Sequence, residues 1–280
     1  MPQTALAHLL RAHGLSPKKH LGQNFLVDET VAADIVRHAG VGTGQRVVEI
    51  GPGVGSLTRP LLAAAGAVLA IEMDASLLPL LAQRTVGLGV LEVIRADALD
   101  LDWSALAAQR GGRLKLVANL PYQITSPLLL RLLEHPGAFQ DLTLMLQKEV
   151  VDRLTATPGN KDYGALTVQL RCLFDVEALF EVPPGAFFPP PRVTSAVVHL
   201  TPLPAPRVPL AAPGRFRNVV RAAFGQRRKT LFNALKSLTP DGDAALNRAG
   251  IDGRRRGETL TLEEFARLSD CLEDGPTLPP

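Results

Sequence analysis

The chain has 280 residues and a formal net charge of +3; 46% of the residues are hydrophobic and 20% are charged. This composition can fill one large core or two smaller ones and is too apolar for a disordered chain. The two cysteines, far apart, exclude a disulfide framework, a cysteine-built zinc site and a CxxC redox motif. No uncharged stretch reaches the ~18 apolar residues of a membrane span, and no signal peptide is evident. We therefore expect a cytoplasmic protein with no membrane partner.

Between residues 45 and 148, short β-branched runs alternate with longer helical patterns. Continuous apolar strands separated by helices are typical of a parallel sheet that is covered on both faces. We therefore predict an α/β fold with a mostly parallel sheet. The predicted strands cover residues 46–50, 67–71, 90–94, 114–118 and 142–146. The predicted helices cover residues 56–65, 75–84, 103–109 and 126–134.

The second half of the chain changes character after residue 200. Further strands are predicted at residues 166–173, 176–180 and 196–200, which would complete the sheet. Five prolines between residues 202 and 213 then indicate a linker. Helical patterns follow at residues 216–224, 230–238, 243–249 and 262–272, and Thr261 with Glu264 fits a capping box for the last helix. We predict an α/β domain over residues 1–204, including an N-terminal extension, and a small all-α domain over residues 205–280.

Positive charge is concentrated in the predicted helical domain. Residues 215–256 carry 11 Lys and Arg side chains against three Asp, whereas residues 1–200 carry 17 basic and 18 acidic side chains. Such asymmetry favours a polyanionic partner, although a solvated helix face would explain it too. The candidate contacts are Arg221, Arg227, Arg228 and Lys229, with a second cluster at residues 254–256.

A glycine-rich loop, Gly51-Pro52-Gly53-Val54-Gly55, follows the first predicted strand and opens a helix. Glycines allow a sharp turn and a close approach of the backbone to a ligand, although a purely structural turn has the same appearance. The spacing is G-x-G-x-G, whereas the dinucleotide fingerprint has its third glycine one position later. Glu49 would add negative charge beside a pyrophosphate and suits a ligand with an ammonium and a sulfonium better.

Two acidic residues follow the next two predicted strands. Glu72 lies about twenty residues past Gly51, where a carboxylate can accept hydrogen bonds from both ribose hydroxyls. Asp97 follows the third strand, where it can accept a hydrogen bond from an adenine amino group. The carboxyl ends of parallel strands share one edge of the sheet, so we expect the loop and both acids at one site. This set resembles the class I S-adenosylmethionine-dependent methyltransferases, which have a Rossmann-like fold.

The fourth predicted strand ends in Asn119-Leu120-Pro121-Tyr122. An exocyclic adenine amine is a poor nucleophile because its lone pair is delocalised into the ring. The Asn119 side-chain oxygen and the Leu120 carbonyl can accept hydrogen bonds from that amine and turn its lone pair toward a sulfonium methyl group. Tyr122 offers a flat face on which an extruded base can stack, so Phe is expected to replace it with little loss. Taken alone, the tetrapeptide would also fit a proline turn with a core tyrosine.

Further motifs accompany this tetrapeptide in a fixed order. They are LGQNFL at residues 21–26, EIGPGVG at 49–55, NLPY at 119–122, QKEV at 147–150 and FFPPPRVTS at 187–195, with RRK at 227–229 and Asn233. Together they resemble the ribosomal RNA adenine dimethyltransferase family, specifically its bacterial small-subunit type, over essentially the whole chain.

This resemblance implies N6,N6-dimethylation of two adjacent adenosines near the 3′ end of small-subunit (16S) rRNA, in ribosome biogenesis. The implied cofactor is S-adenosylmethionine, and the implied partner is small-subunit rRNA or a precursor of the small subunit, bound by the basic helical domain. We expect a monomer. We also expect no metal, because methyl transfer from a sulfonium needs neither an activated water nor a Lewis acid. The implied cofactor contacts are Asn24, Leu26, Gly51, Gly53, Glu72, Asp97 and Asn119. The implied catalytic residues are Asn119, Leu120 and Tyr122, with Phe187 as the second aromatic wall of the base pocket; without the resemblance, Phe187 fits the core equally well.

Three other functions fit parts of the pattern. A large-subunit (23S) rRNA adenine dimethyltransferase of the macrolide-resistance type shares much of the motif order, although residues 21–24, 147–150 and 189–191 favour the small-subunit type. A non-catalytic nucleic-acid-binding factor on the same fold would not need Glu72 or the NLPY tetrapeptide. A nicotinamide oxidoreductase is disfavoured by the glycine spacing.

Overall fold

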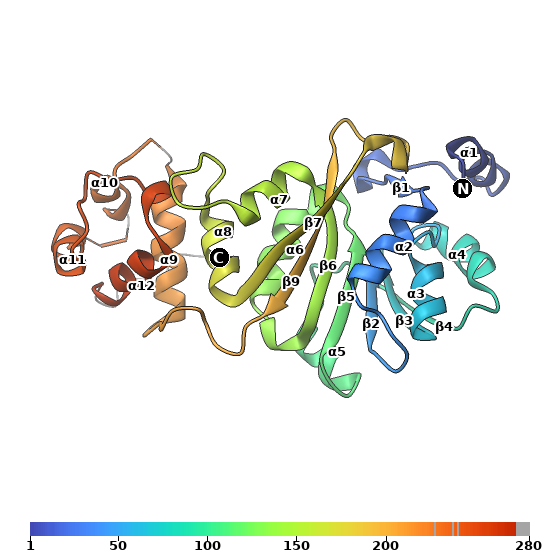
Figure 1. Ribbon diagram of the computed structural model, residues 1–280, viewed down its shortest axis with the longest axis horizontal. Coiled ribbons are helices and arrows are strands. Elements are labelled where there is room, and N and C mark those ends of the chain that lie inside the picture. Colours follow the sequence, from blue (N-terminus) through green and yellow to red (C-terminus); the bar gives the residue numbers. More distant parts are fainter. Residues whose placement is uncertain (227, 237, 240, 273–280) are drawn as a thin grey trace. The chain divides into compact units, whose positions relative to one another are not determined.

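The computed structural model describes residues 1–226, 228–236, 238–239 and 241–272. The chain forms two compact units within these residues (Figure 1). The α/β unit comprises Met1–Val151 and Val176–Pro202, and the helical unit comprises Asp152–Asp175 and the described residues from Leu203 onward. Residues 152–175, which the predicted division at residue 205 assigned to the α/β domain, therefore belong to the helical unit.

A seven-stranded sheet forms the centre of the α/β unit, with strand order β4-β3-β2-β5-β6-β9-β7. Neighbouring strands from β4 to β6 are parallel, and β9 runs antiparallel to β6. All four residues of β2 are buried, as expected for a central strand that is covered on both faces. The predicted mostly parallel α/β sheet is confirmed. The strands are β2 (Val47–Ile50), β3 (Ala67–Glu72), β4 (Val90–Arg95), β5 (Leu114–Asn119), β6 (Phe139–Gln147), β7 (Phe174–Val182) and β9 (Ser195–Pro202).

Helices precede and connect these strands, and three of them, α1, α2 and α7, were not predicted. The helices are α1 (Gln3–Ala12), α2 (Glu29–His38), α3 (Thr58–Ala65), α4 (Leu78–Thr85), α5 (Trp103–Gln109), α6 (Thr125–Leu133) and α7 (Lys148–Thr155). Short 3₁₀ helices are η1 (Lys19–Leu21), η2 (Ala75–Leu77), η3 (Tyr122–Ile124), η4 (Pro136–Ala138) and η5 (Pro184–Ala186). A separate two-stranded sheet pairs β1 (Phe25–Leu26) with β8 (Phe187–Phe188). None of the described helices is long and apolar enough to cross a membrane.

The strand register brings the carboxyl ends of the parallel strands to one edge of the sheet. Ile50 at the end of β2 lies opposite Ile71 in β3 and Ala118 in β5. Glu72 at the end of β3 lies opposite Arg95 at the end of β4. The loops that follow all four strands therefore start at this edge, as the sequence predicts.

The helical unit has its own apolar core, built mainly from α9 and α12 around Phe216, Val220, Phe265 and Leu268. Thr261 and Glu264 form the predicted capping box at the start of α12. The elements of this unit are α8 (Ala165–Leu173), α9 (Pro213–Gly225), α10 (Leu231–Leu235), α11 (Gly242–Ala249), η6 (Gly257–Thr259) and α12 (Leu262–Asp270).

The proline-rich stretch is not a free linker. The Leu203 N–H donates a hydrogen bond to the Leu173 carbonyl (2.8 Å), and the Arg207 N–H donates one to the Cys172 carbonyl (2.8 Å). Val208 is buried in the core of the helical unit. The stretch is therefore fastened to the carboxyl end of α8.

The strand predicted at residues 166–173 is wrong, because this segment forms helix α8. Short apolar runs do not distinguish a buried strand from a buried helix by periodicity alone. Val168, Leu170 and Cys172 are all buried here, since α8 packs into the core of the helical unit. The surroundings, and not the local pattern, decide the structure of this segment.

Candidate active site

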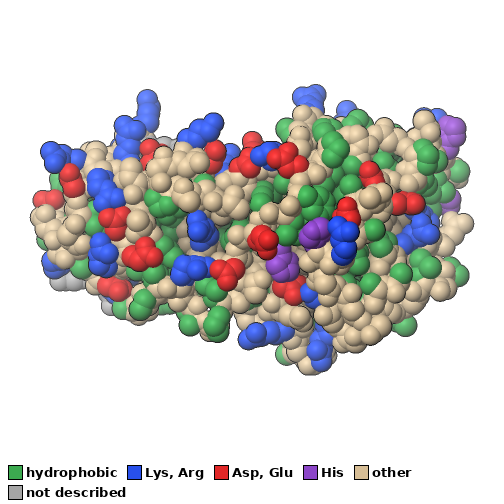
Figure 2. Space-filling model, in the orientation of Figure 1, with side chains coloured by type: hydrophobic (Ala, Val, Ile, Leu, Met, Phe, Trp, Pro, Cys, Tyr) green, Lys and Arg blue, Asp and Glu red, His purple; other side chains and the backbone are tan. Residues whose placement is uncertain are grey.

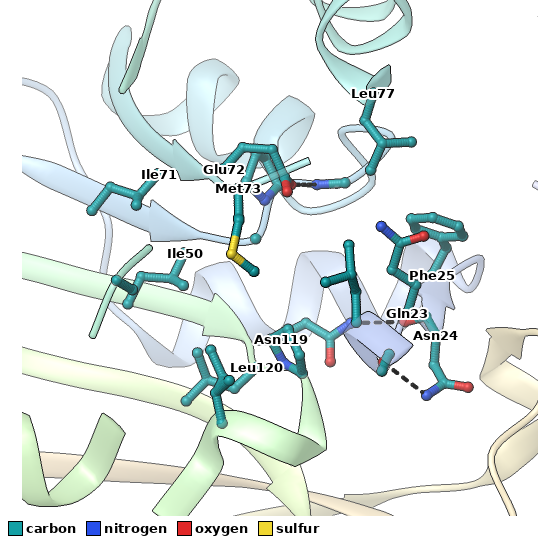
Figure 3. Close-up of a pocket in the computed structure, with 18 of the residues that line it drawn as sticks. Gln23, Asn24, Phe25, Ile50, Ile71, Glu72, Met73, Leu77, Asn119 and Leu120 are labelled. Atoms are coloured by element: carbon teal, nitrogen blue, oxygen red, sulfur yellow. Dashed lines mark hydrogen bonds between the residues drawn. The ribbon is translucent and has the colours of Figure 1, made fainter. Parts of the chain in front are cut away.

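A cavity opens at the carboxyl edge of the sheet (Figure 3). Its apolar walls include Ile50, Ile71, Met73 and Leu77. Every residue that the sequence assigns to cofactor binding lines this cavity, and so do three of the four predicted catalytic residues, Asn119 among them. These residues are Asn24, Leu26, Gly51, Gly53, Glu72, Asp97 and Asn119, with Leu120 and Tyr122.

The glycine loop and Glu72 form one hydrogen-bonded unit. Gly51, Gly53 and Gly55 have φ values of 67°, 56° and 84°, in the left-handed region that favours glycine. A Cβ at Gly53 would also lie 3.0 Å from a ring carbon of Phe25, so glycine is required there on two grounds. The Gly53 N–H donates to Oε2 of Glu72 (3.2 Å). The loop therefore holds the carboxylate in place while each of its oxygens retains a lone pair for a ligand.

Asp74, which was not among the predicted site residues, connects the N-terminal loop to the end of β3. Its N–H donates to Oε1 of Glu72 (2.8 Å). Its carboxylate accepts hydrogen bonds from Lys18 Nζ (2.7 Å) and Gln23 Nε2 (2.9 Å). Burial alone would raise the pKa of Asp74, but hydrogen bonds from Lys18, Ser76 and Gln23 lower it to about 2. Such contacts between distant segments have no signal in the sequence.

Glu49 is a fully buried acid beside the glycine loop. Its side chain lines the cavity, and within the described residues its Oε2 atom has no hydrogen-bond partner. Burial, with a smaller contribution from the negative charge of Glu72, raises the pKa of Glu49 to about 8. Burial also raises the pKa of Glu72, which is 7% exposed. Both acids are thus placed where a positively charged or hydroxyl-bearing ligand would stabilise their ionised forms.

Asn119 and Asn24 lie close together on the opposite side of the cavity (Figure 3). Asn119 Nδ2 donates to the Asn24 carbonyl (3.2 Å), and Asn24 Nδ2 donates to the Gly22 carbonyl (3.2 Å). Because the amide nitrogen of Asn119 is engaged with the N-terminal loop, the remaining Oδ1 atom is the acceptor that its side chain can offer. This is the atom predicted to accept a hydrogen bond from the adenine amine.

Leu120, Tyr122 and Asp97 complete the predicted set. Leu120 is buried, and its N–H donates to the Met145 carbonyl (3.2 Å), which fixes the backbone after β5. Tyr122 is half-buried and opens η3. Asp97 Oδ1 accepts a hydrogen bond from the Leu99 N–H (2.9 Å), which stabilises the turn after β4.

Phe187, predicted as the second aromatic wall of the base pocket, lies in the core of the α/β unit in this structure. Its side chain is 0% exposed and packs in the core, and Phe187 is absent from the described residues that line the cavity. The pairing of β8 with β1 is the reason, because it places Phe187 opposite Leu26 and Phe188 opposite Phe25. Successive strand residues point to opposite faces, so Phe187 enters the core while Phe188 packs beside Phe25.

The predicted basic contacts lie in the helical unit, and they differ in whether an acidic side chain pairs with them. Arg221, Arg228 and Lys229 are exposed, whereas Arg227 lies outside the described residues. In the second cluster, Arg255 donates two hydrogen bonds to Glu264 (2.6 and 2.9 Å), and Arg254 pairs with Asp252. Figure 2 accordingly shows acidic side chains interspersed among the basic ones over this unit. The second cluster is therefore largely neutralised by its own neighbours.

Comparison with known proteins identifies the family. The model of the family described as ribosomal RNA adenine dimethylase matches residues 14–274. The chain belongs to this family. The Ribosomal RNA small subunit methyltransferase A of Magnetococcus marinus is 56% identical over 262 residues, which cover 94% of each chain. The protein of the same name from Pelotomaculum thermopropionicum is 50% identical over 279 residues, which cover 95% of each chain.

Solved structures agree with this assignment. A dimethyladenosine transferase from Plasmodium falciparum superposes with a TM-score of 0.72 at 25% identity, covering 87% of this chain and 95% of that one. The 23S rRNA methyltransferase ErmE superposes with a TM-score of 0.67 at 30% identity, covering 89% of this chain and 99% of that one. The predicted Rossmann-like methyltransferase fold and the predicted family are confirmed, and the chain is an enzyme of this family.

Glu49 is expected to make the stability of the ligand-free protein fall as the pH rises. Below pH 4.5, Glu49 holds its proton in both the folded and the unfolded chain, so the free energy of unfolding does not depend on its titration there. Between pH 4.5 and about 8 the unfolded chain loses the proton first, so the free energy of unfolding falls by up to about 1.4 kcal/mol per pH unit. Glu49→Gln removes this dependence, and urea unfolding across the window should give a flatter profile.

Glu134→Gln, at an exposed position, is the matched control for that experiment and should keep the wild-type slope. Equal slopes in wild type and Glu49→Gln would contradict the assigned protonation of Glu49.

Asp74 is expected to act at the acidic end of the pH range. The pKa of Asp74 is about 2 in the folded chain, against an ordinary value of 3.8. The ionised carboxylate therefore stabilises the fold fully above pH 3.8, and this stabilisation is lost as the pH falls toward 2. Asp74→Asn should lower the free energy of unfolding at neutral pH by on the order of 2 kcal/mol. It should also lose less stability than wild type on acidification. Asp100→Asn, at an exposed position, is the control, and a variant as stable as wild type would contradict the role of Asp74.

Proposed function

We propose that the chain, as a cytoplasmic monomer, catalyses S-adenosylmethionine-dependent N6,N6-dimethylation of two adjacent adenosines near the 3′ end of small-subunit (16S) rRNA. The observation that carries the proposal is that Glu72, Asp97 and Asn119, predicted from three separate strand ends, line one cavity with the glycine loop. The identity of 56% and 50% to proteins named small subunit methyltransferase A supports this substrate over 23S rRNA, because the 23S enzyme ErmE is 30% identical.

The residues of the cavity fit S-adenosylmethionine chemically. Glu72 presents two oriented carboxylate oxygens for ribose hydroxyls, and Asp97 offers an acceptor for an adenine amino group. Glu49 adds a buried carboxyl, one oxygen of which accepts no hydrogen bond from any described residue, and this suits a ligand that carries positive charge. When bound, S-adenosylmethionine supplies an electrophilic methyl group on a positively charged sulfur.

The methyl acceptor is activated by hydrogen bonding and not by a strong base. The Asn119 Oδ1 atom and the Leu120 carbonyl accept hydrogen bonds from the adenine N6 amine and turn its lone pair toward the methyl group. After transfer, the resulting ammonium is acidic enough to lose its proton to water. Positioning therefore supplies most of the rate, which suits a cavity held by a network of internal hydrogen bonds. Tyr122 stacks on the extruded base.

The junction of α9 and α10 is the proposed contact for rRNA phosphates. A recess there is lined by Gln226, Lys229, Asn233 and Lys236. Lys236 Nζ lies 4.2 Å from the centre of the Phe232 ring, which stabilises the ammonium beside the recess. Arg221 and Arg228 add exposed positive charge in the same stretch of chain.

One experiment tests the proposed reaction and its alternatives. The protein is incubated with methyl-labelled S-adenosylmethionine and either unmodified small subunits or unmodified large subunits, and the methylated bases are mapped. Label on two adjacent small-subunit adenosines supports the proposal. Label in the large subunit would instead indicate the 23S reaction, and binding without label would indicate a non-catalytic factor.

Asn119→Ala is expected to slow methyl transfer by about one to two orders of magnitude, because it removes a hydrogen bond made to the reacting amine. RNA affinity should stay near the wild-type value, since phosphate contacts dominate it. Single-turnover rates at saturating cofactor separate the two effects. Asn247→Ala, on the exposed face of α11, is the control. A variant that transfers methyl groups at the wild-type rate would remove Asn119 from the mechanism.

Replacing Arg221, Arg228 and Lys229 with Gln is expected to weaken binding to small-subunit rRNA. For every phosphate that is no longer neutralised, the plot of log affinity against log salt should also become flatter by roughly 0.7–0.9. Cofactor affinity should not change, because the cavity belongs to the α/β unit. Arg254→Gln is the control, since Asp252 already pairs with this guanidinium. A triple variant with wild-type affinity and salt dependence would mean that the RNA surface lies elsewhere.

A further inference from the structure

The Tyr122 hydroxyl has a partner from a distant part of the chain. Its oxygen lies 2.6 Å from the Ser195 Oγ atom, and either group can be the donor. Ser195 is the first residue of β9 and is 0% exposed, whereas Tyr122 is half-buried and lines the cavity. The stacking role predicted from the sequence needs only the face of the Tyr122 ring, so this contact gives the hydroxyl a further, unpredicted function.

Ser195 is held by the seven-stranded sheet. It lies opposite Gln147 in the antiparallel pairing of β9 with β6. The residue before it is also fixed, because the Lys148 N–H donates to the Thr194 carbonyl (2.9 Å). Three consecutive prolines, residues 189–191, restrict the backbone between β8 and this point. Ser195 is thus an anchor on the sheet, and Tyr122 is the group that it holds.

The hydrogen bond fixes the far end of the tyrosine ring. Tyr122 belongs to the short helix η3, whose backbone fixes the near end. With both ends fixed, the ring keeps one orientation relative to the cavity before any base binds. Burial raises the pKa of Tyr122, so its hydroxyl remains protonated at neutral pH and the contact persists there.

We propose that Ser195 is a positioning residue for methyl transfer, which holds the Tyr122 ring in the orientation that stacks on the target adenine. The inference rests on the proposed function, since it needs Tyr122 to contact the base. Loss of the hydrogen bond leaves the ring in place but lets its orientation vary, so the base is delivered to Asn119 less precisely. Small misplacements of a reacting group lower the rate much more than they lower affinity.

The test removes the hydrogen bond from each side separately and together. Ser195→Ala, Tyr122→Phe and the double variant are compared in single-turnover methylation of unmodified small subunits at saturating cofactor. Each single change should slow transfer by on the order of tenfold, and the double variant should be no slower than either single one. Affinities for the cofactor and for the small subunit should remain at wild-type values.

Ser269→Ala is the matched control for loss of a buried serine hydroxyl. Ser269 is 1% exposed, and its Oγ donates to the Ala266 carbonyl (2.8 Å) in α12 of the helical unit. It should lower the melting temperature about as much as Ser195→Ala while leaving the transfer rate unchanged. If Ser195→Ala fails to fold, Tyr122→Phe removes the same bond at a half-buried position, and a wild-type rate in that variant would refute the inference.

Three outcomes would overturn the inference. A wild-type rate in both Ser195→Ala and Tyr122→Phe, with impaired transfer in Tyr122→Ala, would refute positioning by Ser195 and leave the stacking role of Tyr122 intact. Additive losses in the double variant would mean that Ser195 acts independently of Tyr122. A wild-type rate in Tyr122→Ala would refute the stacking role in the proposed function, and the inference with it.

Discussion

The geometry of the cavity depends on the carboxylate of Glu72. Its two oxygens accept hydrogen bonds from the Gly53 and Asp74 N–H groups, which joins the glycine loop to the turn after β3. Asp74 in turn holds Lys18 and Gln23, so the N-terminal loop is fastened to the same point. Three segments that are far apart in the sequence are therefore positioned by two neighbouring acids.

Two acids that line the cavity, Glu49 and Glu72, destabilise the α/β unit when they are ionised. Burying Glu49 and Glu72 raises the pKa of each, and the charge of Glu72 adds to the effect on Glu49. A core made only for stability would place apolar side chains at both positions. Their presence is explained by a ligand that brings compensating charge and hydroxyl groups. The demands of stability and of ligand binding are thus opposed at Glu49. A substitution there that stabilises the fold is expected to lower the affinity for the ligand.

The sequence predicts the residues of this cavity better than it predicts how they are held. Parallel topology places strand ends together, so Glu72, Asp97 and Asn119 could be grouped from their positions after three strands. The contacts of Asp74 and Ser195 could not be predicted, because they join segments that no local pattern relates. The burial of Phe187 could not be predicted, because strand pairing decides which of two adjacent aromatic side chains enters the core. The segment 166–173 was misassigned because its apolar run fits a buried strand and a buried helix equally well.

Counting charges along the chain overstates the positive surface of the helical unit. Arg255 forms two hydrogen bonds with Glu264, an acid of the capping box that starts α12. A residue that completes a helix cap therefore also neutralises an arginine that the sequence offered to RNA. Lys229, by contrast, is exposed and lines the recess at the junction of α9 and α10. A basic residue can bind a phosphate more readily when no acidic side chain already pairs with it. The α9–α10 junction is therefore a better candidate for the RNA contact than residues 254–256.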